Sequence, residues 1–229
     1  MMRGRVRCRV VAVLVSALIA TTIAASSGAP GVSADEALRN LMAGNKRFVN
    51  ARLTNRSLTI KKTREELVRG QKPYAIILSC SDSRVPPEIV FDETLGQLFV
   101  VRVAGNVVDP VVLGSVEYAV EHLGSALIMV LGHEACGAVT AAFDAAGKTE
   151  GNVEAVIDLI TPAVQKAKDT MKGKSRAEQV EAAIDSNIDL AAANLTVESS
   201  LIKDYVDRGK LKIVKGKYHL RRGDVTLLK

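Results

Sequence analysis

The stretch YAIILSCSDSR, residues 74–84, decides the fold of this 229-residue chain. Its first six residues form a short, mainly apolar run, which predicts a buried strand, and Cys80 stands directly at the carboxyl end of that strand. Two further apolar runs, residues 98–103 and 126–131, predict a second and a third buried strand. These three runs are expected to form the centre of one sheet.

Helical patterns alternate with the strands, so the sequence predicts an α/β fold with a mainly parallel β-sheet covered by helices on both faces. The chain is 48% hydrophobic, which suits a single globular domain, and we place this domain at residues 35–229. The expected helices cover residues 35–52, 63–69, 111–123, 136–146, 152–171 and 176–208, the last with a break near Thr196, and two more strands are expected at residues 211–214 and 225–228.

Residues 1–34 have the organisation of a secretory signal peptide. Four arginines precede an apolar run over residues 10–25, and VSA at residues 32–34 resembles a cleavage site. We therefore expect an exported protein, periplasmic or secreted, with no stable membrane anchor once the leader is removed. A retained anchor is the alternative, but the run contains three hydroxyl side chains and is shorter than a typical membrane span.

Removal of this leader lowers the formal net charge from +6 to +2, because residues 1–34 carry four arginines and no acidic residue. A net charge of +2 gives no support for a nucleic-acid partner. The sequence also lacks the glycine-rich motifs that bind nucleotides and dinucleotides, and it lacks the G-x-S-x-G motif of serine hydrolases. These functions are therefore not indicated.

Cys80 and the motif HEAC at residues 133–136 supply ligands for a soft metal ion. The carboxyl ends of parallel strands lie at one edge of a sheet, so Cys80 and His133 can meet there. Two thiols and one imidazole suit Zn²⁺ and leave one of its four positions open, as in catalytic sites. A disulfide between Cys80 and Cys136 is the alternative for an exported protein. We favour the metal, and we expect the start of a helix at Cys136 to stabilise its thiolate.

Asp82 and Arg84 follow Cys80 in the same loop. An arginine can bind a carboxylate through two hydrogen bonds and keep it ionised. Asp82 would then accept a hydrogen bond from a hydroxide on the metal, which predicts a zinc hydrolase or hydratase. An ordinary surface ion pair, which contributes little to stability, is the other interpretation.

Three stretches of the chain, in this order and spacing, resemble the β-class carbonic anhydrases. The resemblance spans roughly residues 35–229, is strongest over residues 71–139, and points to the plant-like subgroup of that family. The stretches are CSDSRVPPEIVFDETLGQLFVVRVAGN at residues 80–106, GSVEYAVEHLG at residues 114–124 and GHEACGAV at residues 132–139.

The resemblance implies one zinc ion per subunit, held by Cys80, His133 and Cys136. It implies the reversible hydration of carbon dioxide to bicarbonate and a proton, with a zinc-bound hydroxide as the nucleophile. Asp82 and Arg84 would form the catalytic dyad that orients this hydroxide.

The resemblance also implies a substrate pocket. Gln71 matches a glutamine that hydrogen-bonds the substrate, and Phe99 and Tyr118 match aromatic residues that come from the adjacent subunit. The expected assembly is therefore a homodimer or a higher homo-oligomer. Ala104 departs from the pattern, since a valine is expected there, and the pocket wall at this point should be more open.

Three other functions stay open from the sequence. The first is a related hydrolase that acts on carbon disulfide or carbonyl sulfide, because the same nucleophile could attack either carbon. The second is a zinc-binding scaffold without catalysis. The third is a thiol oxidoreductase, which is disfavoured because the chain has no C-x-x-C pair.

Overall fold

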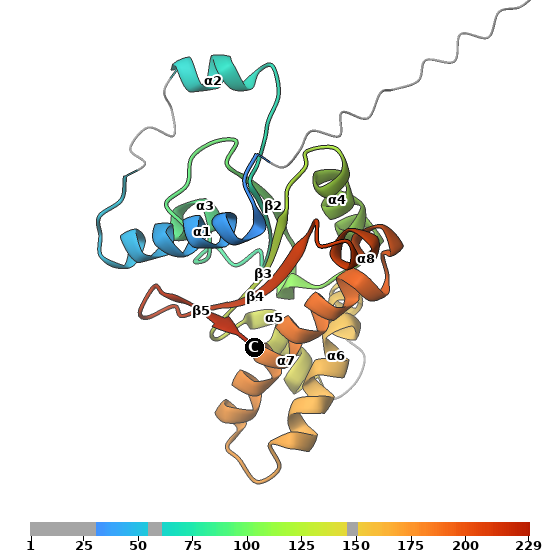
Figure 1. Cartoon of the computed structure of the whole chain (residues 1–229). Helices are drawn as coiled ribbons and strands as arrows, with labels where there is room; N and C mark the ends of the chain where they lie inside the picture. The colour runs from blue at the N-terminus through green and yellow to red at the C-terminus, as the bar shows by residue number, and fades with distance from the viewer. Residues whose placement is uncertain (1–30, 55–60, 146–150) are drawn as a thin grey trace, which may run out of the picture.

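The computed structural model describes residues 31–54, 61–145 and 151–229, so only the last four residues of the expected leader fall within it. Its centre is a five-stranded sheet with the strand order β2-β1-β3-β4-β5 (Figure 1). Strands β1 to β4 run parallel, and β5 is antiparallel to β4. The α/β prediction is therefore confirmed. The strands are β1 (Ala75–Ser79), β2 (Leu98–Arg102), β3 (Leu127–His133), β4 (Lys212–Tyr218) and β5 (Val225–Leu228).

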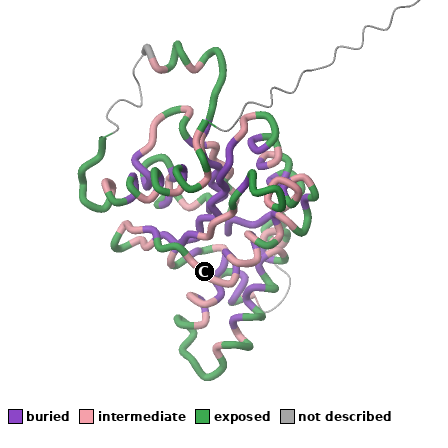
Figure 2. Tube along the Cα trace, viewed as in Figure 1, coloured by how far each residue is buried: buried purple, intermediate pink, exposed green. Residues whose placement is uncertain are grey.

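Alternate residues of the central strands face two separate hydrophobic cores. Ile76 and Leu78 of β1 point into one core, while Ala75 and Ile77 point into the other, because successive side chains of a strand lie on opposite faces. Figure 2 shows this buried centre between the exposed ends of the helices. Both faces are covered, which explains why β1 and β3 are buried along their whole length.

Helices α1 and α3 cover one face of the sheet, and α4 to α8 lie on the other (Figure 1). Ser33 caps α1, Asp109 caps α4, and Ser175 begins α7 with a capping box. None of the helices in the described part of the chain has the length and apolar character that a membrane span requires. The helices are α1 (Ala34–Val49), α2 (Lys61–Leu67), α3 (Pro87–Val90), α4 (Pro110–Glu121), α5 (Gly137–Asp144), α6 (Val153–Thr170), α7 (Arg176–Val197) and α8 (Ser200–Asp207), with a short 3-10 helix η1 (Ala104–Asn106).

The structure differs from the sequence prediction at two places near the carboxyl terminus. The break expected near Thr196 lies slightly later, because Ser199 adopts an extended conformation and caps α8. Strand β4 continues to Tyr218, four residues beyond the predicted strand, and includes Lys215 and Lys217. These lysines carry ion pairs to α7, which the local sequence pattern does not reveal.

Candidate metal centre

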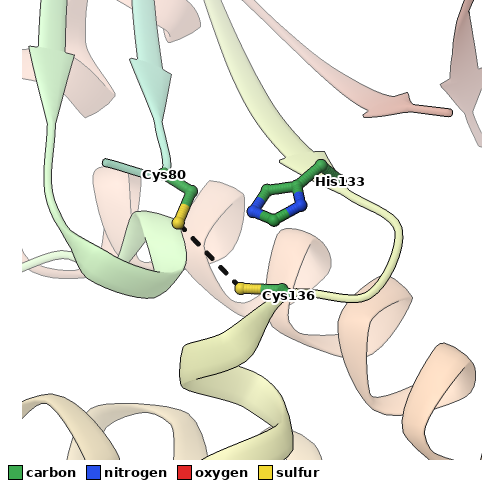
Figure 3. A group of neighbouring side chains, drawn as sticks. All are labelled: Cys80, His133 and Cys136. Atoms are coloured by element: carbon green, nitrogen blue, oxygen red, sulfur yellow. Dashed lines mark hydrogen bonds between the residues drawn. The ribbon is translucent and has the colours of Figure 1, made fainter. Parts of the chain in front are cut away.

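The carboxyl ends of β1 and β3 bring the three predicted metal ligands together. Cys80 directly follows β1, His133 is the last residue of β3, and Cys136 precedes the first residue of α5. Figure 3 shows the two sulfur atoms and the imidazole ring pointing toward one another. Their possible ligand atoms all lie within 4.8 Å of one another, and all three residues are buried. The predicted meeting of two distant segments at one sheet edge is thus confirmed.

The two thiols do not form a disulfide, which corrects the alternative left open by the sequence. Their sulfur atoms are 4.0 Å apart, about twice the length of a sulfur–sulfur bond. Two sulfurs bound to one tetrahedral zinc ion, each at ~2.3 Å from it, lie about 3.8 Å apart. The observed separation therefore fits two zinc ligands.

His133 presents one free ring nitrogen to the two thiols. Its Nδ1–H donates to the backbone oxygen of Glu134 at 2.8 Å, which fixes the orientation of the ring. Its Nε2 atom is buried and has no hydrogen-bond partner among the described residues. A buried nitrogen without a partner is costly, and coordination of a metal ion would satisfy it. The donor set thus fits zinc by geometry and by chemistry.

The environment of the two thiols is asymmetric. The hydrogen bond with Cys136 is the main factor that lowers the pKa of Cys80; burial opposes it, and the imidazole of His133 and the Gly105 N–H, 3.3 Å from the sulfur, add to the lowering. Cys136 shows the opposite shift: its hydrogen bond with Cys80 and its burial raise the pKa, although two N–H groups at the start of α5 lower it. The helix start therefore favours the Cys136 thiolate as expected, but the hydrogen bond with Cys80 and burial outweigh this effect.

Asp82 is held beside the three ligands by Arg84. The Nε and Nη2 atoms of Arg84 donate to the two carboxylate oxygens at 2.9 and 2.7 Å, and its backbone N–H donates to Oδ1 at 2.9 Å. These hydrogen bonds from Arg84 lower the pKa of Asp82, against the effect of burial, so the carboxylate stays ionised. Both carboxylate oxygens of Asp82 are therefore engaged with Arg84. Among the described residues, the cluster of possible ligands consists of Cys80, His133 and Cys136, and three protein ligands leave the fourth position of a zinc ion open.

Two residues that the sequence prediction missed also support the centre. Arg102, the last residue of β2, donates to the backbone oxygens of Cys80 and Asp82 at 3.1 and 2.6 Å. Gly105 has a φ of +70°, and its backbone oxygen accepts a hydrogen bond of 2.7 Å from the buried Asn187. The sequence did contain a sign of each residue. Arg102 is a charged residue at the end of an apolar strand, and Gly105 belongs to a Gly-Asn pair, which marks a turn.

The predicted pocket residues lie in two different places. Ala104 belongs to η1, next to Gly105, and is therefore at the metal side of the sheet. Phe99 lies opposite Ile76 in the register of β1 and β2, so four residues, or about 13 Å of strand, separate its level from Cys80. Tyr118 packs beside Phe99 with ring centroids 6.3 Å apart, and the exposed Gln71 precedes β1. Within one chain, these three residues therefore lie toward the amino-terminal ends of the strands, whereas the metal ligands lie at the carboxyl ends.

The fold and the donor set define a metalloenzyme with a three-ligand zinc site, and comparisons with known proteins give its family. The family model "Carbonic anhydrase" matches residues 75–225. Carbonic anhydrase 2 of Mycobacterium tuberculosis is 40% identical over 201 residues, covering 86% of this chain and 94% of that protein.

Two solved structures of β-carbonic anhydrases, CcaA and the Coccomyxa enzyme in complex with acetazolamide, are each 26% identical to the chain. They align with TM-scores of 0.67 and 0.69 and cover 84% and 83% of this chain, and 95% and 86% of their own chains. The chain therefore belongs to the β-class carbonic anhydrases. Hydration of carbon dioxide is the reaction of this family, and Cys80, His133 and Cys136 form its type of zinc site.

Proposed function

We propose that the chain hydrates carbon dioxide reversibly at the centre formed by Cys80, His133 and Cys136, with Asp82 and Arg84 as the catalytic pair. The observation that carries this proposal is the donor geometry: two free thiols 4.0 Å apart face a buried imidazole nitrogen that lacks a hydrogen-bond partner in the described part of the chain. When bound there, zinc would lower the pKa of a coordinated water and so supply the nucleophile.

The protein's own contribution is to orient this nucleophile. Asp82 Oδ2 lies 3.8 Å from His133 Nε2, so the carboxylate is adjacent to the ligand atoms and can accept a hydrogen bond from a group in the open position. Arg84 keeps Asp82 ionised and fixes the plane of its carboxylate. An ionised Asp82 would accept a hydrogen bond from the O–H group of the nucleophile. This would leave a lone pair on the nucleophile's oxygen free to attack the carbon of carbon dioxide.

The direct test is stopped-flow measurement of carbon dioxide hydration by the purified protein, before and after treatment with a chelator. We expect hydration by the zinc-loaded protein, loss of activity with the chelator, and recovery when zinc is restored. A zinc-loaded protein without hydration activity would instead support the non-catalytic scaffold.

We further propose that a second copy of the chain completes the pocket, as in the plant-like subgroup. Phe99 and Tyr118 cannot line their own metal centre, because the register of β1 and β2 places them toward the amino ends of the strands. Strand β2 is an edge of the sheet, and its neighbour α4 exposes Val111 by 78% and Tyr118 by 48%. These two residues are seven apart on α4 and share one helix face. An exposed apolar surface of this kind supports contact between copies.

A charge on this surface should separate the copies. In the Val111→Glu variant, we expect sedimentation equilibrium to show a shift toward the mass of one chain, because burial of the carboxylate in an apolar contact is unfavourable. Hydration activity should fall with the shift, since Phe99 and Tyr118 then reach no partner. Val197→Glu is the matched control, because Val197 is equally exposed (77%) but lies at the end of α7. Equal masses for both variants would contradict this contact surface.

We also propose that the protein is exported, as a periplasmic or secreted enzyme. The support is the composition of residues 1–34, where four arginines precede an apolar run and a small-residue site. Cell fractionation with amino-terminal sequencing tests this: a mature chain outside the cytoplasm that begins near Asp35 supports export, while a cytoplasmic chain that retains residues 1–34 contradicts it.

A further inference from the structure

The loop that joins the ligands His133 and Cys136 has a strained backbone. Ala135, between them, has a φ of +50°, a left-handed conformation that is unfavourable for a residue with a side chain. This turn folds the chain back sharply, so that a residue at the end of β3 and a residue at the start of α5 can face the same point. An unfavourable conformation of this kind persists only when its surroundings hold it in place.

Glu181 of α7 makes the side-chain contact with Ala135 itself, while the neighbouring Glu134 N–H donates to the backbone oxygen of Tyr218 at 3.0 Å. Its Oε1 atom accepts a hydrogen bond of 3.2 Å from the backbone N–H of Ala135, although 46 residues separate the two. Its Oε2 atom pairs with Nζ of Lys217 at 2.8 Å. Glu181 therefore connects the metal-ligand loop to strand β4 through its two carboxylate oxygens.

Lys217 is itself firmly placed. It lies opposite Gly132 in the register of β3 and β4, one position before the pair formed by His133 and Tyr218. Its side chain is only 9% exposed, and it also pairs with Asp185 Oδ1 at 2.8 Å. A mostly buried ammonium group between two carboxylates leaves Glu181 little freedom to turn away from Ala135.

We propose that Glu181 is a positioning residue for the zinc site: it accepts the hydrogen bond of Ala135, and Lys217 holds it in place, so that His133 and Cys136 stay aimed at one metal ion. The inference rests on the zinc site proposed above. Glu181 contacts neither the ligand atoms nor Asp82 and Arg84 in the structure, and its effect passes through the backbone of the loop. Groups that orient metal ligands commonly change metal affinity or activity by about 10- to 100-fold when they are removed.

The test is the rate at which a chelator takes zinc from the purified, zinc-loaded protein. The Glu181→Ala variant should release zinc about tenfold faster than the parent or more. Asp189→Ala is the matched control, because Asp189 also lies on α7 and also pairs with a lysine of β4, Lys215, at 2.7 Å. The control loses the same kind of helix–strand ion pair but makes no contact with the ligand loop, and it should release zinc at the parent rate.

The visible absorption of a cobalt-substituted sample is a second readout, and a general loss of stability does not change it. Glu181→Ala should alter the visible cobalt absorption, which reports the ligand arrangement, while Asp189→Ala should not. In Glu181→Gln the amide oxygen can still accept the hydrogen bond of Ala135, so its zinc release should be slower than that of Glu181→Ala. Equal rates for the Ala and Gln variants, or an equal acceleration in Asp189→Ala, would overturn the proposal. A parent protein that binds no zinc would refute the zinc site itself, which is a distinct result.

Discussion

Cys136→Ala is expected to yield a folded protein that binds almost no zinc and hydrates carbon dioxide at least about a thousandfold more slowly, since a metal ion supplies several kcal/mol of transition-state stabilisation. The variant keeps only two donors, Cys80 and His133, whereas catalytic zinc sites use three protein ligands. The side chain of Cys136 is nearly fully buried, and alanine fills most of the same space. The fold should therefore persist while the metal is lost. Elemental analysis of the purified protein gives the zinc content, and stopped-flow kinetics give the rate.

The control for this variant is Ser79→Ala. Ser79 is the last residue of β1, directly before Cys80, and it is fully buried. Its hydroxyl has no hydrogen-bond partner among the described residues, so its removal should not cost stability. We expect normal zinc content and a normal rate in the control. A Cys136→Ala protein with one zinc ion per chain and full activity would show that the metal is held elsewhere.

Asp82→Asn is expected to lower turnover by about a hundredfold, the order found when a preorganised hydrogen-bonding group beside the reacting atoms is removed, while the zinc content stays unchanged. Asparagine is nearly the same size, but it offers one acceptor oxygen and an NH₂ group in place of two carboxylate oxygens. The bidentate contact with Arg84 is therefore lost, and the remaining group is neutral. Since Asp82 is not one of the three clustered donors, zinc should remain bound.

Asp224→Asn provides the matched comparison. Arg222 binds Asp224 through two hydrogen bonds of 2.8 and 3.0 Å, with the same two-residue spacing as the pair formed by Arg84 and Asp82. Only the pair beside the metal ligands should affect turnover. Unchanged turnover in Asp82→Asn would remove this carboxylate from the mechanism, and loss of zinc in the same variant would assign it a structural role instead.

The central strands and the metal ligands could be predicted from sequence because their signals are local. Short apolar runs defined β1, β2 and β3, and the carboxyl-end rule then placed Cys80 and His133 at one edge. The same rule could not show whether the thiols would bond to each other, since that depends on a sulfur separation of 4.0 Å set by α5 and the loop before it.

What the sequence did not show depends on contacts between distant segments. Lys215 and Gly216 interrupt the apolar pattern of β4, so the strand was expected to end at residue 214. Only the acids of α7 explain why Lys217, further along the strand, is buried. Asn187 and Glu181 likewise act on loops 82 and 46 residues away. Neither contact leaves a periodic or spacing signal in the chain.

The placement of Cys80 and His133 at the ends of two inner strands of the sheet has a consequence for how the protein acquires its metal. Strands β1 and β3 are joined by backbone pairing from Ile76 to Ser79 and are buried on both sides, so folding alone brings these two ligands together. Small zinc-dependent domains, by contrast, spend binding free energy on ordering their chains. Here the paired strands position two of the ligands without the ion, so we expect less of the binding free energy to be spent on ordering the chain, and metal exchange to leave the sheet folded.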